Sequence, residues 1–112
     1  MLPHKMKISD KAFNALKRLQ NNTGLTVNVG ARLAFFASIE RGYVWSGEEI
    51  ELKQRELDKY TWLGDYGDLV EMLLKQKYPS LEVKDYYKAW GSHVDDGAFI
   101  LESKISLSNL LG

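Results

Sequence analysis

The segment VNVGARLAFFASI, residues 27–39, is apolar on nearly every side of the helix that it would form. Its only polar side chains are Asn28, Arg32 and Ser38. Thr26 can cap the start of this helix and Gly42 can stop it, so we expect a helix up to about Glu40. A helix of this kind must be covered on most sides. The cover is either the C-terminal half of the chain or a copy of the helix in another subunit.

A strand and a helix are predicted before this segment. Residues 4–9 alternate, with Met6 and Ile8 on one side and two lysines on the other, as in a short half-buried strand. Ser9 and Asp10 offer an N-cap for a helix that ends near residue 22. Strand, helix, helix is the order of the ribbon-helix-helix fold, in which the strand pairs with its copy from a second subunit. We therefore predict a mainly α, oligomeric fold with a ribbon-helix-helix-like opening and a helical C-terminal half.

The C-terminal half is less regular in its pattern. Residues 46–64 permit a strand or an irregular arm, and a helix is expected from Asp68 to just before Pro79. A further helix opens at residues 80–82, and Gly91 and the Asp95-Asp96-Gly97 turn signal should weaken or bend it. Residues 98–105 look helical again, and residues 107–111 form a short apolar tail. A chain of 112 residues has room for one domain.

The net charge of zero hides two halves of opposite charge. Residues 1–45 carry seven basic and two acidic residues, whereas residues 46–112 carry eight basic and thirteen acidic ones and most of the aromatic residues. Such a division suits a surface that meets a polyanion, such as a nucleic-acid backbone. It equally suits two halves that attract each other or another subunit.

The candidate DNA contacts lie in the basic half. Lysine and arginine on the strand and first helix, and the N-terminus of the second helix, could contact phosphates. The candidates are Lys5, Lys7, Lys11, Lys17, Arg18 and Thr26. A lysine face predicts backbone binding with little sequence preference, because bases are mostly read by Arg, Asn or Gln. Alternatively, Lys5 and Lys7 are the solvated face of an edge strand. Arg32, on an apolar helix, is interpreted as a paired structural arginine.

Signals for catalysis, metals and cofactors are weak or absent. The chain has no cysteine, and its two histidines, His4 and His93, lie far apart, so we expect no metal, cofactor or catalytic residue. Glu49, Glu51 and Lys53 resemble half of a metal-dependent nuclease motif, but such alternation is common on strands. His93 is expected to be a partly buried core histidine or a surface histidine rather than a general base. No stretch resembles a signal peptide or a membrane span, so a cytoplasmic protein is expected.

Two stretches resemble the DndE family of bacterial DNA sulfur modification, in which sulfur replaces a non-bridging phosphate oxygen. One comprises TGLTVN, residues 23–28, and RLAFFASIERG, residues 32–42. The other is RELDKYTWLGDY, residues 55–66, which leads into the apolar stripe of residues 69–74. With the matching size and opening, the likeness covers most of the chain. It contains no catalytic signature.

The resemblance implies a small oligomeric accessory protein, a dimer or tetramer, that binds double-stranded or nicked DNA. Such a protein works beside other Dnd sulfur-modification proteins, in a setting of restriction and modification. The basic residues Lys5, Lys7, Lys11, Lys17 and Arg18 fall on the segment that matches the family's basic N-terminus. The alternatives are a scaffold for partner proteins with incidental DNA affinity and a ribbon-helix-helix repressor. The zero net charge departs from what is expected of a DNA-binding protein. Binding to DNA therefore requires the lysines to lie together on one surface.

Overall fold

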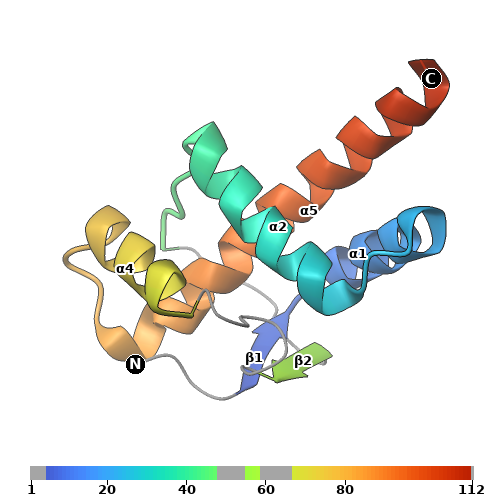
Figure 1. The fold of residues 1–112 in the computed structure, drawn as a ribbon. Coiled ribbons are helices and arrows are strands. Elements are labelled where there is room, and N and C mark those ends of the chain that lie inside the picture. Colours follow the sequence, from blue (N-terminus) through green and yellow to red (C-terminus); the bar gives the residue numbers. More distant parts are fainter. Residues whose placement is uncertain (1–4, 48–54, 59–66, 112) are drawn as a thin grey trace.

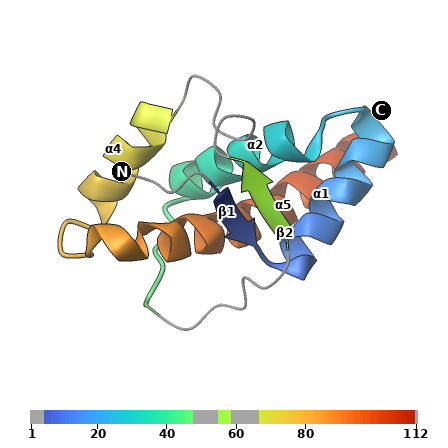
Figure 2. The same cartoon turned by 90° about the horizontal axis from the view of Figure 1, so that it is seen from below.

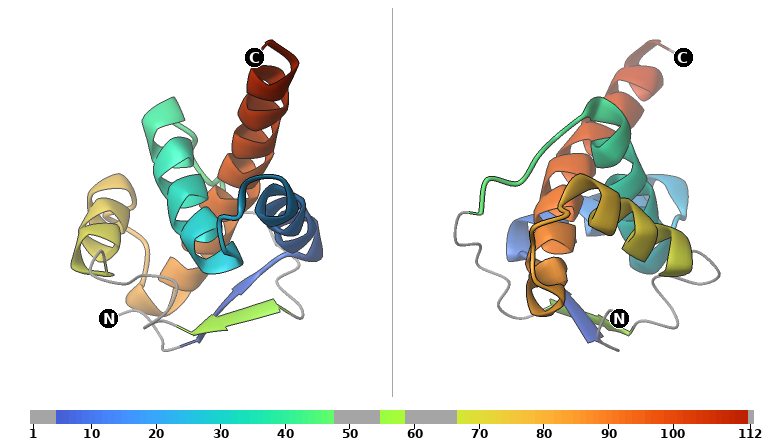
Figure 3. Two further views of the ribbon diagram at one scale, coloured as in Figure 1. Left: turned by 45° about the vertical axis from the view of Figure 1, so that its right-hand side comes forward. Right: turned by 90° about the vertical axis from the view of Figure 1, so that its left-hand side faces the viewer.

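The fold is mainly helical, with two short strands at one end (Figure 1). The computed structural model describes residues 5–47, 55–58 and 67–111. In chain order the elements are β1 (Lys5–Ile8), α1 (Asp10–Thr23), α2 (Val27–Arg41), β2 (Arg55–Asp58), α4 (Gly67–Lys77), a 3-10 turn η2 (Val83–Asp85) and α5 (Tyr86–Leu111). In Figure 1 and the left view of Figure 3, α1 and α4 flank α2 on opposite sides. The C-terminal part of α5 extends beyond the other helices.

The strand β1 pairs with β2 of the same chain. The two strands form an antiparallel two-stranded sheet beneath the helices (Figure 2). The expected strand is therefore present, but the predicted ribbon with a second subunit is not confirmed. The sequence permitted a strand or an irregular arm in residues 46–64, and the structure contains a strand at residues 55–58. Residues 48–54 and 59–66 lie outside the described residues. The strand β1 can pair within its own chain without a second subunit, because β2 supplies the partner strand.

Both N-terminal helices have the caps that the sequence predicts. Ser9 accepts a hydrogen bond from the N–H of Ala12 at 3.0 Å, and Thr26 accepts one from Val29 at 3.3 Å. Gly24 and Gly42 end the two helices with φ values of 81° and 83°. Glycine takes this left-handed conformation without the steric penalty of a Cβ atom. Local sequence thus sets the bounds of α1 and α2.

The core lies where α2 crosses α5. Phe35 of α2 and Trp90 of α5 are both fully buried there. At Gly97 the two backbones meet, and a Cβ atom added to this glycine would lie 1.7 Å from the carbonyl oxygen of Ala34. The C-terminal half therefore covers one face of α2, as one of the two sequence-based alternatives proposed.

The C-terminal region contains fewer helices than expected. The helix from Asp68 is confirmed in α4, but residues 80–82 precede a short 3-10 turn, and one continuous helix runs from Tyr86 to Leu111. Gly91 and residues 95–97, which were expected to weaken or bend a helix, lie inside this continuous helix, and the separate tail expected at residues 107–111 is part of it. Tertiary packing overrides the local signals, because Gly97 lets α2 approach and the two neighbouring aspartates bind other elements.

Candidate nucleic-acid interface

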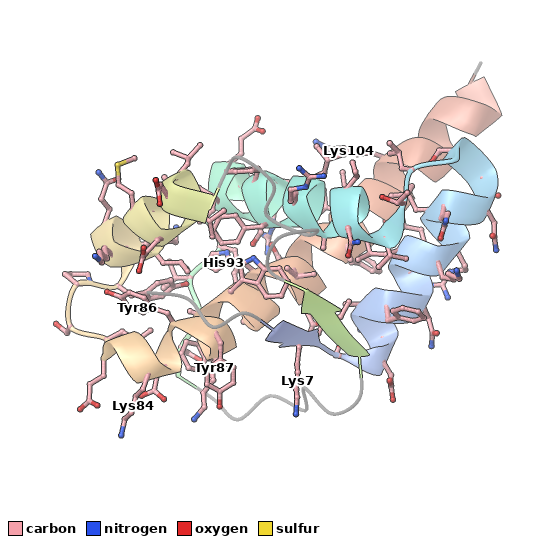
Figure 4. All side chains as sticks on the ribbon, turned by 60° about the horizontal axis from the view of Figure 1, so that its bottom comes forward. Lys7, Lys84, Tyr86, Tyr87, His93 and Lys104 are labelled. Carbon is pink, nitrogen blue, oxygen red and sulfur yellow. The ribbon has the colours of Figure 1, made fainter. Side chains whose placement is uncertain are left out.

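The strand β1 carries two of the predicted contacts, Lys5 and Lys7. The side chain of Lys7 is exposed and points away from the helices (Figure 4), whereas that of Lys5 lies outside the described residues. The antiparallel register pairs Lys5 with Asp58 and Lys7 with Glu56. Directly opposite positions in such a pair share a face. Each of the two lysine positions is therefore paired in the backbone register with an acidic position.

The helix α1 presents a polar outward face. Lys17 is exposed on it together with Asn14 and Asn21. The Nζ atom of Lys17 lies 3.3 Å from Oε1 of Gln20 in its own helix. Amide and ammonium groups are common donors to phosphate oxygens. The two asparagines were not among the residues predicted from the sequence, and together with Lys17 they give this face of α1 a polar surface that is open to solvent.

Arg18 is engaged by an acidic residue of α5. Its Nε and Nη2 atoms both donate to Glu102, the second at 3.0 Å to Oε1. The hydrogen bond from Arg18 lowers the pKa of Glu102 below its ordinary value. The guanidinium nevertheless stays largely exposed, with 58% of its side chain accessible. The structure therefore places Arg18 at the predicted surface but with its charge compensated.

Lys11, one of the other candidates, lies near a second carboxylate of α5. Ser9 donates to Asp95, which ties the start of α1 to α5. Burial raises the pKa of Asp95, and the bond from Ser9 and the charge of Lys11 oppose that rise. Lys11 and Arg18 are seven residues apart, as are Asp95 and Glu102. Two cations of α1 that are two helix turns apart therefore lie alongside two carboxylates of α5 with the same spacing.

The junction between α2 and α5 repeats this arrangement. Arg41 donates from Nε to Oδ2 of Asp96 at 3.1 Å and makes a second bond through Nη2. Asp95 and Asp96 therefore bind neighbouring elements and do not form the turn that the sequence suggested. The division of charge along the chain is in part an attraction between the two halves, which was the alternative to a polyanion surface.

Two further predicted positions lie on α2. Thr26 is exposed, but its hydroxyl is occupied in capping the helix. Arg32 is half-buried, and its Nε atom is buried without a hydrogen-bond partner in the described residues. The structural pairing expected for Arg32 is thus not found in the part of the chain that the structure describes.

A buried polar network surrounds His93 between the helices (Figure 4). Its Nδ1 atom lies 2.8 Å from Oγ of Ser38, and its Nε2 atom lies 2.6 Å from the hydroxyl of Tyr78. The Tyr78 hydroxyl accepts the N–H of Trp45 at 2.8 Å. A consistent donor order runs from Trp45 to Tyr78 to His93 Nε2, and from His93 Nδ1 to Ser38. This order requires a neutral imidazole.

Burial explains the charge state of this histidine. Desolvation, assisted by the positive charge of Lys77, lowers the pKa of His93 to about 4. His93 and Ser38 are both 0% exposed, so a substrate has no access to the serine. The network joins α2, α5 and the segments after α2 and α4, so His93 lies in the core and not at the surface, the other place that the sequence left open. The sequence contains no spacing signal for it, because its members lie up to 55 residues apart.

The described residues contain neither a metal site nor a membrane span. They contain no cluster of three or more His, Cys, Asp or Glu residues able to hold a metal ion. Among the same residues, none of the helices is both long and apolar enough to cross a membrane. The surface of α1 and β1 remains the candidate site.

Comparison with known proteins identifies the family. The model of the family "DNA sulphur modification protein DndE" matches residues 5–109. The crystal structure of DndE from Escherichia coli B7A, described as involved in DNA phosphorothioation modification, superposes with a TM-score of 0.80 at 44% identity, covering 90% of this chain and 99% of that one. The crystal structure of a DndE mutant gives 0.81 at 41% identity, with coverage of 90% and 99%. No curated protein matches the chain. The chain therefore belongs to the DndE family of DNA phosphorothioation proteins.

Proposed function

We propose that this chain is a non-enzymatic, homo-oligomeric, cytoplasmic subunit that holds DNA for the other Dnd proteins. It contacts the backbone of intact or nicked duplexes without strong sequence preference. Membership of the DndE family carries this proposal. The exposed Lys7, Lys11 and Lys17 support it, because lysine is a point charge suited to phosphate and not to paired contacts with bases.

The site is centred on α1. Lys7, Lys11 and Lys17 provide exposed ammonium groups, and Arg18 joins them when a phosphate replaces Glu102 as its partner. Lys5 and Thr26 are flanking contacts in this proposal. Symmetry in an oligomer repeats this basic surface, so several copies of it can contact one duplex although the net charge stays zero.

The test is a salt titration of DNA binding by fluorescence anisotropy. A variant with Lys7, Lys11 and Lys17 all changed to Ala should bind unrelated duplexes more weakly and to the same extent. The slope of log K against log salt should fall by about three, since each lost phosphate contact removes about 0.9. Lys104→Ala is the matched control, because Lys104 is exposed and lies on the other side of the molecule from Lys7 in Figure 4. An unchanged slope in the triple variant would reject this site.

The internal ion pairs favour one other function, a scaffold for Dnd proteins with incidental DNA affinity. Arg18 and Arg41 are already compensated by α5, which leaves less charge for DNA. A scaffold would bind neither nicked nor intact duplex at about 0.15 M salt. It would still retain purified Dnd partners in a pull-down, and the triple lysine variant would retain them equally.

A further inference from the structure

A shallow pocket of about 370 Å³ lies between the segment that follows α2 and the C-terminal end of α4 with the residues after it. Trp45, Pro79 and Leu81 form an apolar wall of this pocket, and Ser46 and Ser80 contribute hydroxyl groups. Apolar surface with a few polar groups that fix orientation is typical of a ligand site. In Figure 1, α4 lies on the opposite side of α2 from α1, so the pocket is separate from the DNA contacts proposed for α1.

The pocket has an excess of positive charge. Among the described residues, Lys77 is the single charged one in the lining, which contains no carboxylate. Lys77 is half-buried, and neither a hydrogen bond nor an ion pair connects it to another residue of the described part of the chain. Desolvation and then the charge of Lys77 lower the pKa of His93 to about 4, so this charge also acts on the interior. An anion in the pocket would balance the ammonium group, and the serine hydroxyls can donate to its oxygen atoms.

A backbone hydrogen bond fixes the two sides of the pocket to each other. The N–H of Trp45 donates to the hydroxyl of Tyr78 at 2.8 Å. Lys77 and Pro79 are the direct neighbours of Tyr78 in the chain. The pocket therefore offers cationic and apolar surface in a fixed arrangement, which favours a ligand that needs both.

An ordinary phosphodiester matches only part of this surface. Both of its non-bridging oxygens are strong acceptors, and an oxygen that faces the apolar wall would lose its hydration without gaining a donor. A phosphorothioate keeps the negative charge but has one oxygen and one sulfur at these positions. Sulfur is a weak, polarisable acceptor that makes favourable contacts with aromatic rings. The ammonium and hydroxyl groups thus suit the oxygen, and the apolar wall suits the sulfur.

We propose that this pocket binds a phosphorothioate linkage in DNA. The remaining non-bridging oxygen accepts hydrogen bonds from Lys77 and the serine hydroxyls, and the sulfur contacts Trp45 and Pro79. The pocket is shallow enough to take a group on the backbone of a duplex without burying a base. This inference goes beyond the proposed function, because it lets the chain distinguish modified from unmodified DNA. The phosphorus of the linkage is chiral, so one diastereomer alone presents oxygen and sulfur to the matching sides.

Anisotropy titrations with three short duplexes of one sequence test the proposal. One duplex contains phosphodiesters throughout, and each of the other two carries a single central phosphorothioate as a pure diastereomer. The wild type should bind one phosphorothioate duplex about tenfold more tightly than the unmodified duplex. It should bind the other diastereomer about as tightly as the unmodified duplex.

Two variants of the pocket should lose this preference. Lys77→Gln removes the cation that holds the linkage, and Pro79→Ser replaces part of the apolar wall by a polar group. Lys75→Gln is the matched control, because Lys75 is exposed and lies in the last turn of α4 but outside the lining. It should keep the tenfold ratio. The triple lysine variant of the proposed function should bind all three duplexes more weakly and keep the ratio as well.

The outcomes separate the pocket from the DNA contacts of α1. Equal affinity of the wild type for the three duplexes overturns the proposal. A preference that survives both Lys77→Gln and Pro79→Ser places sulfur recognition elsewhere and overturns it too. Should Lys77→Gln fail to fold by circular dichroism, Pro79→Ser, at an exposed position, carries the test.

A dinucleotide tests the pocket without the duplex. Should the wild type bind none of the three duplexes, the proposed function fails, and NMR with a phosphorothioate-linked dinucleotide decides about the pocket. This dinucleotide should shift the backbone amide signals of residues 45–47 and 77–81 more than its phosphodiester counterpart does. The same shifts with both dinucleotides, or none with either, overturn the proposal.

Discussion

Gly97→Ala should destabilise the protein although it improves the helix propensity of α5. The added Cβ atom would lie 1.7, 2.3 and 2.7 Å from the carbonyl oxygen, carbonyl carbon and Cα of Ala34. These are backbone atoms, which cannot rotate away as a side chain can. The helices must separate by about 1.3 Å to bring the nearest contact to 3.0 Å.

The magnitude follows from two opposing terms. Overpacking of a buried contact costs about 1 to 3 kcal/mol, and a backbone clash belongs at the upper end. Replacing glycine by alanine inside a helix stabilises the helix by about 1 kcal/mol. The net loss is about 2 kcal/mol, which corresponds to a fall in melting temperature of about 10 °C for a domain of this size. The assay is urea unfolding followed by circular dichroism, with thermal unfolding as a second measure.

Gly30→Ala is the matched comparison. Its Cβ would meet the flexible end of Leu16 at 3.0 Å, so the side chain can adjust and the stability should change by less than about 1 kcal/mol. Adding Ala34→Gly to Gly97→Ala should not restore stability, because the clash is with the main chain of residue 34. A Gly97→Ala protein as stable as the wild type would refute this reasoning.

Three further predictions concern polar contacts. Folding should weaken as the pH falls from about 6.5 to 4, because the unfolded chain binds a proton at His93 that the native state, with its pKa lowered to about 4, rejects. The loss approaches about 3 kcal/mol in urea titrations and should be absent in His93→Gln. Glu102→Gln should release Arg18, tightening DNA binding and steepening the salt slope by about one; an unchanged slope would contradict a phosphate role for Arg18. Ser9→Ala removes the cap of α1 and a partner of Asp95, so the free energy of unfolding should drop by about 1 to 2 kcal/mol in thermal melts, and a drop below 0.5 would count against it.

The charge pattern illustrates how partners in the chain compete with a ligand. The basic N-terminal segment was interpreted first as a surface for a polyanion. In the structure, part of that positive charge is compensated within the chain, since Arg18 and Arg41 each bind a carboxylate of α5 with two donors. Exposed ion pairs of this kind are weak, so a phosphate can still displace one. The balance between these uses is what the Glu102→Gln experiment measures.

Local signals were sufficient for the N-terminal half of the fold. Ser9, Thr26, Gly24 and Gly42 mark the ends of α1 and α2, because caps act through neighbouring backbone groups and need no distant partner. The burial of α2 also follows from composition and pattern, because its segment is apolar on nearly every side. The likeness to the DndE family came from short stretches of sequence and is confirmed over residues 5–109.

The tertiary structure decided the features that depend on distant residues. The partner of β1 is β2, which lies about 50 positions further along the chain. The sequence of a four-residue strand does not indicate which strand it pairs with. The same holds for α5, where glycine and two aspartates predicted a weakened or bent helix. There, close approach to Ala34 and bonds to Ser9 and Arg41 stabilise a continuous helix. Sequence by itself determined the two N-terminal helices and which half is basic. Only packing determined which charges are paired, because pairing depends on distances that local pattern does not contain.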